Sequence, residues 1–144
     1  HAASLERPVK LMIALEMIGY YDSAPGSQNY PYPAMSWLYP DRGDFIAVVG
    51  RMQDINAVRQ VKAALLSSRD LSVYSMNAPG FIPGFVFSDP LNYWQHDIPA
   101  VMITDTAFYR NKQYHLPGDT ADRLNYQKMA QVVDGVITLL YNSK

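Results

Sequence analysis

Apolar residues along this chain follow two different periods, and each predicts one type of element. Residues 9–18 are almost continuously apolar without a helical period, which is typical of a central strand covered by helices on both faces. Residues 45–50, 71–76 and 99–104 are short apolar runs, several of them rich in β-branched or aromatic side chains, and predict three further strands. No apolar run approaches the ~20 residues that cross a membrane.

Helical spacing of apolar residues predicts three helices. The first covers residues 54–68 and has an aspartate suited to the N-cap at its start. The second begins with Asp89 as N-cap and Pro90 in the first turn, and ends near residue 96. The third carries an apolar stripe over residues 126–140.

Strands that alternate with helices predict an α/β fold with a three-layer arrangement, in which a mostly parallel mixed sheet is flanked by helices. In such folds ligands bind beyond the carboxyl ends of the strands. Two long irregular segments, residues 20–43 and 105–122, are expected as loops. The first is rich in Pro, Gly and Tyr, and its aromatic rings could wall a pocket.

Charge and composition exclude several classes of function. With 12 basic and 13 acidic residues mixed along the chain, there is no basic surface for nucleic acid or for anionic lipid. The lack of cysteine removes disulfides, thiolate zinc sites and thiol nucleophiles. We find no glycine-rich phosphate loop, no G-x-S-x-G turn and no H-E-x-x-H helix.

Polar residues at the predicted strand ends are the candidates for chemistry. Glu16 lies among apolar residues, so its carboxylate needs a partner, and position alone favours an ion pair or backbone donors over a metal. Asp105 closes a strand, and His115 and Asp119 follow in a loop from the same edge. A lone loop histidine is more often exposed than a ligand, although imidazole with carboxylates is the usual set for hydrolytic zinc. Asp89 is better explained as an N-cap than as a catalytic group, and a triad of Ser88, Asp89 and His115 lacks an oxyanion turn.

Several blocks of the sequence, in this order, resemble metallopeptidase family 28, the dizinc aminopeptidases. They are LEMIGYY at residues 15–21, SD at 88–89, IPAVMITDTAFYRN at 98–111 and YHLPGDT at 114–120. Shorter matches at residues 26–28, 39–41 and 43–50 extend the likeness over nearly the whole chain. The resemblance implies a zinc-dependent enzyme that removes N-terminal residues from peptides, secreted or periplasmic.

The family's motifs imply roles for particular residues. Glu16 and His115 match zinc ligands, one for each of two ions, and the general base, a glutamate, is expected upstream of this chain. The resemblance therefore implies that residues 1–144 are the C-terminal half of a domain, inactive alone, completed by its N-terminal half or by another copy of the chain. We expect three aspartates to orient the metal ligands: Asp89, Asp105 and Asp119. We expect four aromatic residues to line the substrate pocket: Tyr20, Phe108, Tyr109 and Tyr114.

Two departures from the family pattern leave alternatives open. The family usually has histidine where this chain has Pro90, and threonine where it has Leu116. Catalytic zinc needs about three protein ligands, so Glu16 and His115 alone leave both ions undercoordinated, and zinc is expected to be absent from the isolated chain or bound only in part. The rivals are a non-enzymatic α/β binding module of the same fold and a glutaminyl-cyclase-like acyltransferase.

Overall fold

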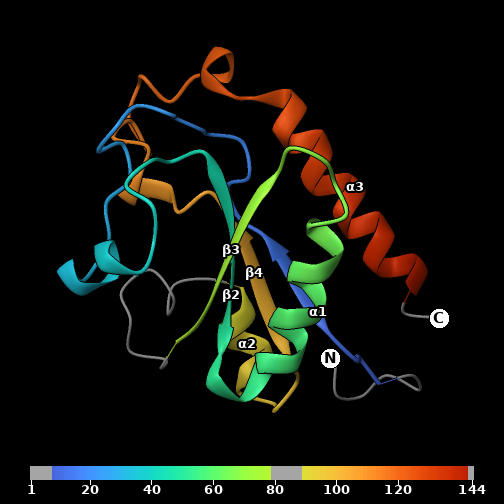
Figure 1. The fold of residues 1–144 in the computed structure, drawn as a ribbon. Helices are drawn as coiled ribbons and strands as arrows, with labels where there is room; N and C mark the ends of the chain where they lie inside the picture. The colour runs from blue at the N-terminus through green and yellow to red at the C-terminus, as the bar shows by residue number, and fades with distance from the viewer. Residues whose placement is uncertain (1–7, 79–88, 143–144) are drawn as a thin grey trace.

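A four-stranded mixed sheet forms the centre of the protein (Figure 1). This computed structural model describes residues 8–78 and 89–142. The strands lie in the order β1-β4-β2-β3, with bounds Met12–Leu15 for β1, Phe45–Arg51 for β2, Ser72–Ala78 for β3 and Ala100–Thr104 for β4. Pairing is parallel between β1 and β4 and between β2 and β3, and antiparallel between β2 and β4. The predicted α/β class is confirmed; Ser88 lies outside the described residues.

Helices cover both faces of the sheet, which gives the three predicted layers. On one face α1 (Ile55–Leu65) and α3 (Tyr126–Asn142) share a buried core with alternate residues of the strands, whereas α2 (Pro90–Trp94) packs on the other face through Trp94. Short 3-10 helices complete the described elements, at Pro33–Trp37, Met52–Asp54, Ala107–Tyr109 and Ala121–Arg123. No helix in the described part of the chain is long and apolar enough to cross a membrane.

The strand predicted at residues 9–18 is shorter than expected, and within this four-stranded sheet it has a neighbour on one side. Among the described strands β1 pairs with β4 alone, so it lies at the edge of the sheet. The extended conformation ends because Met17 has a left-handed backbone, with φ of 52°. An apolar run indicates burial on both faces, but it carries no information about which strands lie beside it.

Both predicted N-cap positions are correct, but neither aspartate caps its helix with its side chain. Asp54 is buried, and its carboxylate accepts a hydrogen bond from Arg51 Nε at 2.9 Å. Arg51 thus holds the Asp54 side chain away from the start of α1.

The second helix ends at Trp94, whose indole N–H donates to the Ala100 carbonyl.

The long loop of residues 20–43 is fastened to the sheet by its aromatic rings. Tyr30 contacts Tyr39, Tyr39 contacts Tyr74 of β3, and Tyr74 packs edge-on against Phe45 of β2, with ring centroids 5.1 to 6.2 Å apart. The hydroxyl of Tyr39 donates to the Ser75 carbonyl. These rings hold the loop in place; the structure gives them a packing role.

Candidate functional site

The carboxyl ends of β1 and β4 meet at one edge of the sheet, and the polar candidates follow directly from them. The Glu16 N–H donates to the carbonyl of Ile103 at 3.0 Å, and the Asp105 N–H donates to the carbonyl of Met17. Since β1 and β4 are parallel, their following residues leave the sheet side by side. The predicted convergence of Glu16 and Asp105 at one edge is therefore present.

Asp105 is the most buried acid of this edge, with 2% of its surface exposed. Its Oδ2 accepts from the N–H groups of Gly19 and Tyr20, and its Oδ1 accepts from the N–H of Ala107. Burial raises the pKa of Asp105, while these donations and the Arg110 guanidinium oppose that rise. The carboxylate fixes the turn that follows β1.

Arg110 is a buried cation at this edge that the sequence interpretation did not single out. Its Nη1 donates to the carbonyls of Tyr20 and Phe45, and its Nε donates to Gln28 Oε1. Burial lowers the pKa of Arg110, and nearby acids, Asp105 first, oppose this effect. A side chain at Gly43 would lie 2.5 Å from Arg110, so the guanidinium requires a glycine there.

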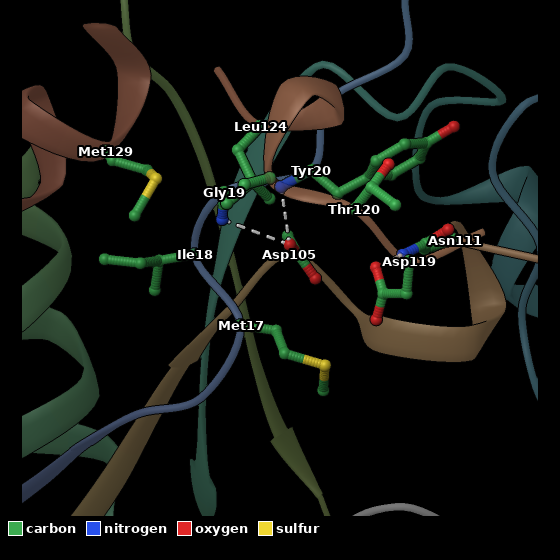
Figure 2. Close-up of a pocket in the computed structure, with 11 residues that line it drawn as sticks. Met17, Ile18, Gly19, Tyr20, Asp105, Asn111, Asp119, Thr120, Leu124 and Met129 are labelled. Atoms are coloured by element: carbon green, nitrogen blue, oxygen red, sulfur yellow. Dashed lines mark hydrogen bonds between the residues drawn. The ribbon is translucent and has the colours of Figure 1, made fainter. Parts of the chain in front are cut away.

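A pocket of about 490 Å³ opens beside Asp105 (Figure 2). One wall is apolar and comes from the turn after β1 and the region of α3, with Ile18, Leu124 and Met129. The opposite wall is polar and includes Asp119 and Asn111, which are joined by a hydrogen bond of 2.8 Å. Ligand pockets commonly combine such an apolar lining with a few placed polar groups.

Glu16 is half-buried, and Asp89 is its neighbour. The Asp89 N–H donates to Glu16 Oε1 at 3.2 Å, so the structure provides a backbone donor of the kind expected from the sequence. Burial raises the pKa of Glu16, the Asp89 carboxylate acts in the same direction, and the N–H bond opposes both. The Glu16 carboxylate is therefore held by the backbone of the residue that begins α2.

His115 is exposed and has a left-handed backbone, with φ of 59°. Its ring stacks on Tyr114 at 3.8 Å, and Phe108 joins Tyr114 to Tyr109 in the same aromatic cluster. Of the four aromatic residues expected to line a substrate pocket, only Tyr20 lines the pocket in Figure 2. A role of the other three in substrate binding stays a prediction.

The structure brings together some of the expected metal-site residues and not others. Glu16 lies beside Asp89, and Asp119 and Asp105 share a pocket. No hydrogen bond or ion pair between described residues joins Glu16 to His115. The described residues contain no group of three or more His, Cys, Asp or Glu that could hold a metal ion. The role of Glu16 and His115 as zinc ligands is neither confirmed nor contradicted by this arrangement.

Backbone strain is concentrated at the same edge. Of the six described non-glycine residues with positive φ, four lie here, at Met17, Thr106, Ala107 and His115. Such conformations cost of order 1 kcal/mol each and persist where surrounding structure enforces them, often at functional sites. The sequence gives little sign of this strain, because Met, Thr and Ala are not favoured in that conformation, and of the four types only histidine is enriched there.

Comparison with solved structures establishes the fold. No protein-family model matches the chain. The LapA aminopeptidase of Legionella pneumophila is 20% identical with a TM-score of 0.63, and the match covers 92% of this chain and 30% of that one. LapB of the same organism is 17% identical with a TM-score of 0.65, over 93% of this chain and 31% of that one. The chain has the fold of part of these proteins.

A much closer relative is known by sequence. The uncharacterized protein YfbL of Escherichia coli (strain K12) is 95% identical over all 144 residues. The chain spans 45% of the length of that protein. More than half of the longer relative therefore lies outside the region described above.

Proposed function

We propose that this chain is part of a zinc-dependent aminopeptidase of metallopeptidase family 28, which removes N-terminal residues from peptides. The observation that carries the proposal is that the parallel strands β1 and β4 end together at one strained edge, with Glu16 directly after β1 and Asp105, which lines a pocket there, directly after β4. The motif resemblance and the fold shared with the LapA aminopeptidase support the reaction class. Activity requires the longer protein, because the general base is expected outside this chain.

Glu16 and His115 are the proposed zinc ligands. Glu16 Oε1 accepts one long N–H bond and lies beside a second acid, while the imidazole of His115 is exposed. A carboxylate and an imidazole are suitable zinc donors, but a catalytic zinc takes about three protein ligands, so these two fit only as part of a larger set. When bound, zinc would activate a water molecule and polarise the scissile carbonyl.

The remaining residues of this edge would position the ligands and the substrate. Asp105 holds the backbone at Gly19 and Tyr20 and thereby the turn after Glu16. Asp89 donates its N–H to the Glu16 carboxylate, and Asp119 lies on the polar wall of the pocket. Such outer groups keep metal ligands in one orientation.

A second candidate, a non-enzymatic module of the same fold, is favoured by one observation. Pro90 is fully buried in the first turn of α2, next to Asp89 and Glu16, where the family has histidine. A buried proline cannot bind a metal or donate a proton. This would leave the fold intact while weakening the site.

The test uses full-length YfbL, which contains this chain at 95% identity. We expect the purified protein to contain zinc and to hydrolyse leucine p-nitroanilide, with activity lost in 1,10-phenanthroline and restored by zinc. Glu16→Gln and His115→Ala should each lower kcat/KM by at least about 100-fold, because even outer groups of metal sites contribute 10- to 100-fold. Lys112→Ala, an exposed neighbour, is the matched control.

Other outcomes identify the alternatives. A folded full-length protein that binds no zinc and does not cleave the anilide, with or without added metal, would be the non-enzymatic module. Cyclisation of an N-terminal glutamine peptide without anilide cleavage would indicate the acyltransferase. Either result ends the aminopeptidase proposal.

A further inference from the structure

The helix α3 has a second apolar stripe, and this stripe is exposed in the described part of the chain. Its buried face meets α1 through Val132, Gly135 and Leu139. An outer stripe recurs at intervals of four and three along the helix, at Tyr126, Ala130, Val133, Ile137 and Leu140. Its four large side chains are 44% to 61% exposed. A surface helix normally has polar residues there, and this spacing is that of a helix seam with a partner.

The edge strand β1 is also built for a partner. It contains only the residues Met, Ile, Ala and Leu. The Met12 and Glu16 N–H groups donate toward β4, so by alternation the N–H groups of Ile13 and Leu15 point to the free edge. Native proteins protect a free edge with charges, prolines or bulges, and β1 has none of these within its bounds.

The opposite edge of the sheet provides an internal comparison. There β3 has the sequence SVYSMNA, in which exposed and buried residues alternate at its start, and the Tyr39 hydroxyl covers its Ser75 carbonyl. That edge is partly polar and partly covered. The contrast shows that the apolar edge of β1 is not a general property of this sheet.

The two features belong to one region. The Asn125 N–H donates to the Gly19 carbonyl at 2.8 Å, and Gly19 lies against Met129, so α3 begins where the chain leaves β1. The side chains of Leu11, just before β1, and of Ile13, within β1, pack against the same core as the buried face of α3. Figure 1 shows α3 running beside α1 over this face of the sheet.

We propose that the outer stripe of α3 and the free edge of β1 form one docking surface for the part of the longer polypeptide outside residues 1–144. This part adds a strand beside β1 and packs apolar side chains on the outer stripe. The length of the relative supports this occupant, because the chain accounts for 45% of YfbL and matches 30% of the LapA chain. The inference does not depend on zinc or on peptidase activity.

Amide hydrogen exchange tests the surface directly, in full-length YfbL and in the 144-residue chain. In the longer protein we expect peptides that span β1 and α3 to exchange at least about tenfold more slowly, because docking adds protection against local opening. Peptides from β3, at the other edge, should exchange alike in both proteins. Equal exchange of β1 and α3 in the two proteins overturns the proposal.

A charge in the outer stripe gives an independent test. Ile137→Lys should lower the Tm of full-length YfbL by several degrees and change that of the 144-residue chain much less. Gln127→Lys adds the same charge at an exposed polar position of α3 and is the matched control. If Ile137→Lys instead dissociates a dimer of the 144-residue chain and leaves full-length YfbL unchanged, the occupant is a second copy and our proposal is wrong.

Discussion

The N–H of Tyr20 donates to Asp105 Oδ2 at 2.8 Å, joining residues that are 85 positions apart in the sequence. The same oxygen accepts from Gly19, so one buried carboxylate holds the turn that leaves β1 against the end of β4. Glu16 lies just before that turn. The geometry of the candidate ligand therefore depends on an acid that comes from another strand.

Replacing Asp105 with Asn should destabilise the protein. Oδ1 and Oδ2 both accept backbone N–H groups, and an amide has only one acceptor oxygen, so Asp105→Asn leaves at least one buried donor unpaired. We expect a loss of about 1 to 3 kcal/mol in the free energy of unfolding, measured with urea. Asp134→Asn on the exposed side of α3 should change it by less than about 0.5 kcal/mol. Equal effects of the two variants would contradict the role of Asp105.

Tyr30 should contribute stability that is lost at high pH. Its hydroxyl donates to the Pro40 carbonyl at 2.6 Å, and burial raises its pKa from 10.0 to about 12. The folded state holds the phenol proton of Tyr30 more tightly than the unfolded state does. The contribution of Tyr30 to the free energy of unfolding is therefore complete below the unfolded pKa, and it falls as the pH rises from 10.0 to about 12.

The comparison of wild type with Tyr30→Phe isolates the effect of Tyr30, since the other tyrosines affect the stability of both proteins equally. Near neutral pH the variant should be less stable by about 1 kcal/mol, the value of one hydrogen bond. This difference should shrink through the alkaline window. Urea unfolding at several pH values measures it, and a difference that does not vary with pH would show that the phenol is not held in its neutral form.

The sequence predicted the elements well because local patterns determine them. The periods at residues 54–68 and 126–140 yielded α1 and α3, and the apolar runs yielded four strands within a few residues. The meeting of Glu16 and Asp105 at one edge was also predictable, because parallel strands end together. These features need only local preference and one general rule about α/β sheets.

What the sequence did not reveal depends on contacts between distant segments. Arg110 binds carbonyls after β1 and in β2 and the amide of Gln28, and no local pattern marks an arginine for that role. The order of the strands was not predicted for the same reason, since it is set by pairing between segments that are far apart in the sequence. The aromatic rings of residues 20–43 were expected around a pocket, yet Tyr30 and Tyr39 pack toward the sheet.

Two substitutions of His115 separate its backbone strain from its chemistry. Glycine adopts its φ of 59° without strain, whereas alanine is destabilised there by about 1 kcal/mol. Both variants lose the stack on Tyr114. His115→Gly should therefore be about 1 kcal/mol more stable to urea than His115→Ala, while both abolish zinc-dependent hydrolysis by full-length YfbL. If the hydrolytic activity of the two variants instead changes in proportion to their stability, the role of His115 as a ligand is contradicted.

The close approach of α3 to α1 depends on Gly135. A Cβ at this position would lie 2.8 Å from the Leu65 Cα and 2.7 Å from its Cδ2, so the helices would have to move apart. Gly135→Ala should therefore destabilise the protein by about 1 to 3 kcal/mol through overpacking, although alanine favours a helix by about 1 kcal/mol. Ala130→Gly, at an exposed position of α3, measures that helix preference in urea unfolding. A Gly135→Ala variant that gains about 1 kcal/mol would mean that the helices pack less closely than this structure has them.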